Sequence, residues 1–285
     1  MRTISAEQIE VYQNYLIEEE KSSATISKYL YDIRSFGDWL STSELDKSVV
    51  LSYKAYLLER YSASSVNSII SSLNSFFAYL GWFDLKVKTV KIQRQIFASN
   101  EKELTKAEYE RLLNAAKNNK RLYLLMQTIC STGIRVSELR HITVEAVVQK
   151  QAEINCKGKR RTVFLPNKLC EALKRYIKEQ KIKSGPVFVT KNGKPLDRSN
   201  IWSDMKKLCK TAGVSESKVF PHNLRHLFAR TFYAVNKDIV RLADVLGHSS
   251  VNTTRIYTME SGYVHKKTAR KAWAVKMLKY KIQTT

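Results

Sequence analysis

Three side chains suited to phosphate chemistry lie within five residues of one another in the segment PHNLRHLFAR. His222, Arg225 and His226 are spaced i, i+3 and i+4, so a helix presents them on one face while Leu224 and Phe228 turn toward a core. A planar guanidinium beside an imidazole supplies what a phosphodiester needs, a cationic fork and a group that handles protons. A chance cluster of surface residues is the alternative.

Three further candidate groups lie elsewhere in the second half of the chain. Arg135 follows Gly133, which permits a tight turn in TGIRVSEL. His248 comes directly after Gly247, which is expected to end a helix with an apolar stripe. Tyr257 follows His248 by nine residues. Each signal is weak alone, because a single arginine is usually structural and a tyrosine, one of fifteen, usually packs in a core.

A basic segment with β-type flanks lies between these candidates. Ala152–Cys156 and Thr162–Leu165 flank the run Lys157-Gly158-Lys159-Arg160-Arg161, a pattern that predicts a β-hairpin with a basic tip. Val187–Val189 is expected to form a short strand before the turn at Lys191–Lys194. The chain after Ser199 has helical periodicity interrupted at glycines.

The first part of the chain predicts four helices. Ser5 with Gln8 forms a capping box before the first, Ser22-Ser23 precedes the second, Asp46 can cap a third through about Arg60, and the fourth stops at Gly81. One face of the fourth is small, polar and uncharged. This face could approach a phosphate backbone closely or be an ordinary solvated face. Its residues are Ser64, Ser65, Asn67, Ser68, Ser71, Ser72 and Asn74.

The helical period fades after Lys86, and a basic strip follows. Lys86, Lys88, Lys91 and Arg94 cluster there, and Thr105 with Glu108 forms a capping box that opens a new helix. We therefore expect a helical domain over residues 1–97, a linker over 98–104 and a mixed domain over 105–285. The basic strip, together with Lys159, Arg160 and Arg161, is predicted to contact nucleic acid.

Charge is distributed unevenly along the 285 residues. Residues 1–98 hold eleven basic and eleven acidic side chains, so the whole formal net charge of +23 lies in the remainder. A solvated surface usually mixes both signs, and a one-sided excess favours a polyanionic partner such as DNA or RNA. The four cysteines are far apart, which predicts neither zinc nor disulfides. No signal peptide or membrane span is expected, and a cytoplasmic, nucleoid-associated location follows.

In their order and approximate spacing, these motifs resemble the tyrosine recombinases, the phage integrase family with its Xer-like members. The matching positions are Arg135 in TGIRVSEL, Lys157 in the hairpin, His222 and Arg225 in HNLRH, His248 in LGHSS and Tyr257 in TTRIYT. The family hairpin often carries two lysines separated by two residues, whereas CKGKRR is one residue tighter, so Lys159 remains an alternative to Lys157.

The resemblance implies a mostly α fold with a small β-hairpin. A helical, SAM-like core-binding domain precedes a mixed α+β catalytic domain that ends in a tail helix. It implies cleavage by Tyr257, phosphate binding by Arg135 and Arg225, proton removal by His222, a hydrogen bond from His248 and a general acid at Lys157. A 3′-phosphotyrosine and a Holliday junction follow. Neither a Walker-type loop nor a cluster of metal-binding carboxylates is found, so no cofactor is expected.

The resemblance also implies the partners: double-stranded DNA with inverted-repeat core sites and other copies of the chain in a tetramer. Accessory proteins are a further possibility, and no membrane is implied. Resolution of dimers or cointegrates and integration or excision of a mobile element stay open as biological roles. Two alternatives use a similar sequence pattern, a type IB topoisomerase that relaxes DNA and a DNA-binding protein without catalytic activity.

Overall fold

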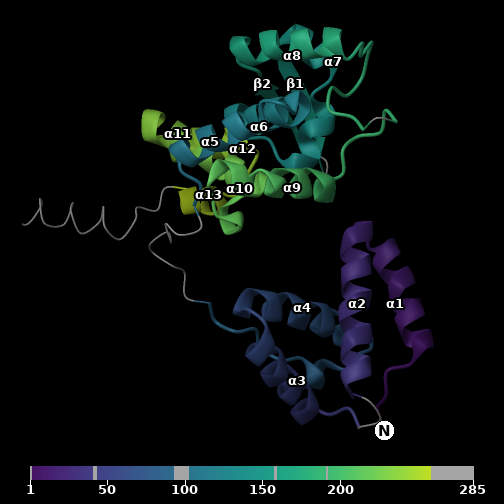
Figure 1. The fold of residues 1–285 in the computed structure, drawn as a ribbon. Coiled ribbons are helices and arrows are strands. Elements are labelled where there is room, and N and C mark those ends of the chain that lie inside the picture. The colour runs from purple at the N-terminus through teal and green to yellow at the C-terminus, as the bar shows by residue number, and fades with distance from the viewer. Residues whose placement is uncertain (1, 41–43, 93–102, 157–158, 191, 258–285) are drawn as a thin grey trace, which may run out of the picture. The chain divides into compact units, whose positions relative to one another are not determined.

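The structure is a computed structural model, and it describes residues 2–40, 44–92, 103–156, 159–190 and 192–257, without the side chains of Cys156 and Lys159. The chain divides into two compact units between Arg94 and Gln95. The predicted linker therefore falls largely outside the described residues, as do Arg94, Lys157 and the predicted tail helix. The described part is mostly helical with one two-stranded antiparallel sheet, as the sequence predicts (Figure 1).

Unit 1 contains the four helices that the capping signals predict. They are α1 (Ala6–Glu18), α2 (Ser23–Leu40), α3 (Lys47–Arg60) and α4 (Ala63–Tyr79), followed by the short 3-10 helix η1 (Phe83–Leu85). Ser5 and Gln8 form the predicted capping box, and Asp46 caps α3 through the Val49 amide. Each helix contributes one apolar stripe to a single core that includes Tyr12, Phe36 and Phe76.

Part of the polar face of α4 forms hydrogen bonds within unit 1. Asn67 and Asn74, two turns apart, hold the extended chain that follows η1. The Asn74 side chain donates to the Val87 carbonyl at 2.8 Å and accepts from the Val87 amide at 3.0 Å. Asn67 makes the same pair of bonds with Val90, at 2.9 and 2.7 Å. Each amide side chain thus makes the two hydrogen bonds that a neighbouring strand would make to the backbone. Asn67 and Asn74 are therefore not free to contact a phosphate backbone.

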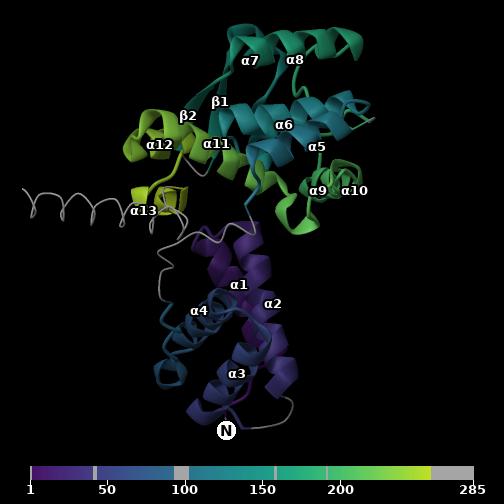
Figure 2. The same ribbon diagram turned by 60° about the vertical axis from the view of Figure 1, so that its left-hand side comes forward.

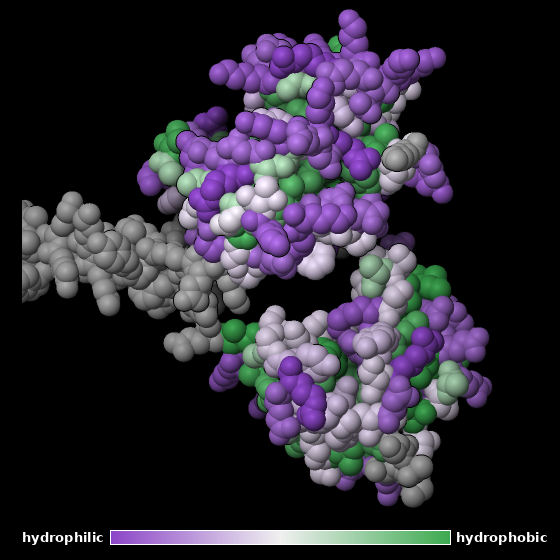
Figure 3. Space-filling view, in the orientation of Figure 1, coloured by the Kyte–Doolittle hydropathy of each residue, from purple (hydrophilic) through white to green (hydrophobic). Residues whose placement is uncertain are grey.

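The serines of the same face divide between buried and exposed positions. Ser72 is fully buried and donates to Asp32 of α2 at 2.6 Å, so it belongs to the core of unit 1. Ser64, Ser65, Ser68 and Ser71 are exposed. The surface over α4 is correspondingly pale, neither strongly hydrophilic nor hydrophobic (Figure 3).

These contacts hold the described part of the basic strip, which contains Lys86, Lys88 and Lys91. Val87 is buried, whereas Lys86, Lys88 and Lys91 are exposed, so the extended chain turns its lysines outward. Two more lysines cover the backbone of the strip: Lys54 donates to the Lys88 carbonyl at 2.6 Å, and Lys47 donates to the Lys86 carbonyl.

Unit 2 is built around α6, which lies between α8 and α9 in both ribbon views (Figures 1 and 2). No helix in the described part of either unit is long and apolar enough to span a membrane. The helices and strands of unit 2, with 3-10 helices marked η, are α5 (Lys106–Ala115), α6 (Lys120–Thr132), η3 (Val136–His141), α7 (Val144–Gln149), β1 (Gln151–Cys156), β2 (Lys159–Phe164), α8 (Asn167–Glu179), α9 (Arg198–Lys207), α10 (Cys209–Ala212), η4 (Glu216–Lys218), α11 (Pro221–Asn236), α12 (Ile239–Leu246), α13 (Val251–Thr254) and η5 (Arg255–Tyr257).

Two details of the predicted β structure are wrong. The hairpin register pairs Cys156 with Lys159, so the loop has only two residues and Arg160 and Arg161 belong to β2 instead of the tip. Val187–Val189 forms no strand, because only single bridges join Thr143 to Pro186 and Val189 to Pro195. A two-residue loop lets the strands pair almost to the turn, whereas an isolated bridge lacks a partner strand long enough to extend it.

Substituting Asn74 by alanine tests the order of the basic strip. The Asn74→Ala change removes two partly buried hydrogen bonds, so the free energy of unfolding of unit 1 should fall by about 1–3 kcal/mol. Urea denaturation measures the loss, and hydrogen exchange at the Val87 amide reports its location. Ser64→Ala, at an exposed position of the same helix, serves as the control and should change neither. Unchanged exchange at Val87 would show that Asn74 does not hold the strip.

Candidate active site

Arg225 is the most deeply buried charged group of unit 2. It lies on α11, where Pro221 opens the helix and Leu224 and Leu227 face the core, and only 1% of its surface is exposed. Its guanidinium donates to the backbone carbonyls of Gly133 and Leu246, the latter at 2.7 Å. Burial lowers its pKa to about 10, which still leaves the group charged at neutral pH.

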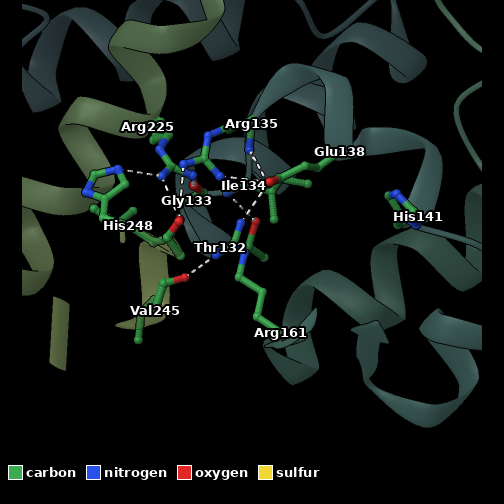
Figure 4. Close-up of polar contacts among 12 residues, drawn as sticks. Thr132, Gly133, Ile134, Arg135, Glu138, His141, Arg161, Arg225, Val245 and His248 are labelled. Carbon is green, nitrogen blue, oxygen red and sulfur yellow. Dashed lines mark hydrogen bonds and ion pairs between the residues drawn. The ribbon is translucent and has the colours of Figure 1, made fainter. Parts of the chain in front are cut away.

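Arg135 lies beside Arg225 on the turn that follows α6 (Figure 4). This turn requires Gly133, whose φ is +66° and whose position leaves no room for a Cβ, since that atom would lie 2.3 Å from the Phe228 ring. The Arg135 side chain is 36% exposed, so part of its guanidinium remains open to an anion. The structure therefore brings together two arginines that are 90 residues apart in sequence.

Glu138, which was not among the site residues predicted from the sequence, holds Arg135 in place. Its carboxylate accepts from the Arg135 amide at 2.7 Å and from the Arg135 guanidinium at 2.9 Å. Burial alone would raise the pKa of this carboxyl, but the Arg135 amide and the charges of Arg161 and Arg135 hold it below its usual value. A glutamate three residues after an arginine in TGIRVSEL is the signal that could have revealed it.

His248 is fixed on both sides of its ring. Gly247, with φ at +64°, ends α12 and directs the chain toward Arg225. His248 Nε2 lies 2.9 Å from Arg225, which can only donate, so Nε2 accepts and Nδ1 carries the proton toward Thr254 Oγ1 at 2.8 Å. Burial and the charges of the arginines lower its pKa to about 4. In this arrangement neither ring nitrogen is free to donate to a phosphate.

Tyr257 lies between two histidine rings. Its side chain is 5% exposed and packs with Ala229, Leu242 and Leu246. The ring centroid of His226 lies 4.8 Å from that of Tyr257 at an interplanar angle of 86°, and the His248 ring stacks 6.1 Å away. The predicted nucleophile therefore lies beside His226 of α11 and His248 of the loop that follows α12.

His222 and His226 form an edge-to-face pair on α11, with ring centroids 4.7 Å apart. Burial lowers the pKa of both groups, helped by the charge of Arg225, and that of His226 falls to about 4. His226 contacts the Tyr257 ring, and its buried Nε2 has no hydrogen-bond partner among the described residues. The sequence placed His226 on the same face as His222 and Arg225 but gave it no role.

The basic residues of the hairpin differ in their surroundings. Lys157 and the side chain of Lys159 lie outside the described part, so the structure does not place either candidate general acid. Arg160 is exposed on β2. Arg161 turns inward, and its guanidinium lies 2.6 Å from Glu138 and also donates to the Val245 carbonyl (Figure 4).

The described part of the chain groups no three histidine, cysteine, aspartate or glutamate side chains as a metal site would require. The positive groups near Tyr257 are instead arginines, fixed by carbonyls and by Glu138. Such an arrangement can bind a phosphodiester through two guanidinium groups and present a tyrosine to it.

Known proteins resemble this chain over most of its length. Residues 102–263 match the model of the phage integrase family, and residues 9–82 match the N-terminal SAM-like domain of phage integrases. Tyrosine recombinase XerA of Thermococcus kodakarensis is 31% identical over 263 residues, which cover 88% of this chain and 90% of that protein. Tyrosine recombinase XerD of Listeria monocytogenes is 30% identical over 277 residues, with coverage of 88% and 93%.

Solved structures show the same fold. A crystal structure of XerA recombinase matches with a TM-score of 0.53 and 26% identity, covering 93% of this chain and 98% of that one. A lambda integrase dimer bound to a COC′ core site matches with a TM-score of 0.74 and 17% identity, covering 90% and 96%. The family match covers more than half of the chain, and the curated relatives span nearly all of it. The chain belongs to the phage integrase family and is a tyrosine recombinase.

Proposed function

We propose that this protein is a site-specific DNA recombinase in which Tyr257 forms a covalent link to the cleaved strand. The arrangement that supports this most is the pair of Arg135 and Arg225 beside a tyrosine flanked by neutral histidines. Two fixed guanidinium groups stabilise the charge that builds on a phosphate during displacement. The curated relatives, which are named tyrosine recombinases, support the same activity.

In the proposed cleavage step, the Tyr257 hydroxyl oxygen attacks phosphorus and the bond to the 5′ oxygen breaks. The products are a 3′-phosphotyrosine and a free 5′-hydroxyl. Arg135 and Arg225 hold the non-bridging oxygens, while Lys157 protonates the departing oxygen. The 5′-hydroxyl of a partner duplex then attacks the phosphotyrosine, which releases Tyr257 and gives a Holliday junction after one round. The number of phosphodiester-type bonds is conserved, so the reaction consumes no nucleotide.

The histidines serve as proton acceptors and hydrogen-bonding groups in this proposal. A tyrosine hydroxyl has a reference pKa of about 10, so a nearby base favours attack at neutral pH. His222 is the base that the family motif indicates, and the contact of His226 with the Tyr257 ring makes His226 a second candidate. His248 can donate to the phosphate only if Nδ1 leaves Thr254, or if Nε2 gains a proton and also moves away from Arg225.

We propose double-stranded DNA with inverted-repeat core sites as the substrate and a tetramer of this chain as the active form. Crystal structures of relatives with the same fold include a lambda integrase tetramer bound to a Holliday junction. Lys86, Lys88, Lys91 and Arg94, with Lys159 and Arg160 of the hairpin, are the proposed contacts to phosphates. Arg161, which the sequence also assigned to this set, instead contacts Glu138 and the Val245 carbonyl. The proposed domains remain residues 1–97 and 105–285, joined by 98–104, and the proposed location is the nucleoid in the cytoplasm.

The Tyr257→Phe change tests the nucleophile. It should abolish covalent protein–DNA adducts on a suicide substrate, because no hydroxyl remains to attack, and should leave affinity in a band-shift assay nearly intact. Tyr233→Phe, in a residue that packs against the same small core, is the matched control and should form adducts. Adducts that persist in Tyr257→Phe would identify another nucleophile, of which Tyr263 is the nearest in sequence.

Replacing Lys157 by alanine tests the general acid. Cleavage of ordinary DNA should slow by about two to four orders of magnitude, the usual contribution of general acid catalysis. A substrate whose 5′ leaving group is a thiolate should be cleaved normally, because a thiolate departs without a proton. The rates are measured as adduct formation in a single turnover. If Lys159→Ala shows this rescue and Lys157→Ala does not, the roles of the two lysines are exchanged.

The excess of positive charge predicts a steep dependence of DNA binding on salt. A protein that neutralises about six to ten phosphates loses roughly three to five decades of affinity between about 50 and 200 mM salt. Titrations of the whole chain on one core site give the slope of log affinity against log salt. A nearly flat slope would contradict the role given to the net charge of +23.

A further inference from the structure

Arg161 joins three segments that carry the proposed active site. It lies on β2, and its side chain is only 14% exposed. One end of its guanidinium lies 2.6 Å from Glu138, which holds Arg135, and the other donates to the Val245 carbonyl near the end of α12. The same side chain covers Gly247, where a Cβ would lie 2.6 Å from Arg161 Cδ.

These contacts attach the hairpin to the arginine pocket. In the described part of the chain β1 and β2 pair only with each other, and Ala152, Ile154 and Val163 pack into the core of unit 2. Arg161 lies closer to the turn than Val163, following Lys159 by two positions and Lys157 by four, so its contacts join the turn end of the hairpin to the arginine pocket. The orientation of this end relative to Arg135 and Arg225 is therefore the part of the hairpin geometry that Arg161 controls.

The charge of Arg161 is also matched inside the protein. Glu138 is 2% exposed and contacts both Arg135 and Arg161, so this carboxylate offsets part of both charges. The Arg161 side chain is only 14% exposed, against 36% for Arg135, and both ends of its guanidinium already have partners, so Arg161 presents less of its charge to an external phosphate than Arg135 does. Arg160, one position earlier and exposed, has no such partner in the described residues and is the better phosphate contact.

We propose that Arg161 is a positioning residue that sets the hairpin lysine against the scissile phosphate, and that it is not a DNA contact. The inference rests on the proposed strand cleavage by Tyr257. Glu138 keeps two hydrogen bonds to Arg135 when Arg161 is absent, so the phosphate pocket itself should survive its loss. What is lost is the attachment of the hairpin, and with it delivery of the proton to the 5′ oxygen.

The experiment compares Arg161→Gln with Arg160→Gln, which removes the same charge one position away. Single-turnover cleavage is measured on two suicide substrates that differ only in the 5′ leaving atom, oxygen or sulfur. Displacement of a catalytic group by about 1 Å costs on the order of a hundredfold in rate, so Arg161→Gln should slow cleavage of the oxygen substrate by about that factor. It should cleave the sulfur substrate within about threefold of the unaltered chain. Arg160→Gln removes a proposed phosphate contact, so it should affect both substrates alike and leave the ratio of their rates equal to that of the unaltered chain.

Three further measurements separate the proposal from its rivals. Loss of one phosphate contact lowers the salt slope of DNA binding by about one, and we expect this for Arg160→Gln and not for Arg161→Gln. Arg161→Lys keeps the charge but has a single nitrogen, which cannot span both acceptors, so its rate on the oxygen substrate should be intermediate. The double variant Arg161→Gln with Lys157→Ala should be no slower than Lys157→Ala alone.

Equal slowing on both substrates would overturn the proposal and assign Arg161 to the arginine pocket. Normal cleavage of the oxygen substrate by Arg161→Gln would also overturn it. The rate ratio of the two substrates is taken within one preparation, so any unfolded fraction cancels. Failure of the proposed function is distinguishable, since the unaltered chain would then form no Tyr257-dependent adduct even with the sulfur substrate.

Discussion

The buried guanidinium of Arg225 is the constraint on which the rest of unit 2 depends. No described carboxylate lies within ion-pair distance of it, although removal of a charge from water costs several kcal/mol. Its partners are instead His248 Nε2 and the carbonyls at the ends of two helices, Gly133 after α6 and Leu246 at the end of α12. The last carbonyls of a helix lack partners within the helix and carry its partial negative charge, so two helix ends together stabilise one cation.

This solution explains why both helices end in left-handed glycines. A positive φ at Gly133 and at Gly247 turns the chain sharply where each helix ends. The carbonyl of Gly133 itself and that of Leu246, directly before Gly247, accept from Arg225. A carboxylate in direct contact with Arg225 would neutralise it and compete with a phosphate. Carbonyl dipoles hold the side chain without cancelling its charge. The carboxylate of the site, Glu138, contacts Arg135 and Arg161 instead.

The residues that the sequence revealed are those with a local signature. Capping boxes at Ser5 and Thr105, and the glycine after α12, located helix boundaries because the hydrogen bonds involved span only three or four residues. Arg135 and Tyr257 were predicted from family motifs, which are also local in sequence. The pairing of Arg161 with Val245 spans 84 residues, and that of Asn74 with Val87 depends on how the chain folds back over α4. Nothing in the local pattern distinguishes such residues from a DNA contact or a solvated helix face.

The positive charge of the site also determines the state of its histidines. The charges around Arg225 add to burial in lowering the pKa of His226 and His248 to about 4, so both rings are neutral near pH 7. Neutral imidazoles can accept a proton from a tyrosine, but protonated ones cannot. In the proposed mechanism the arginines have two roles: they attract the phosphate, and they keep the adjacent histidines in their neutral, proton-accepting form. A general acid would lose its proton in the same surroundings. This is a physical reason for the acid to be a lysine, whose intrinsic pKa is higher. It is also a reason for that lysine to lie on the hairpin, which Arg161 joins to the pocket.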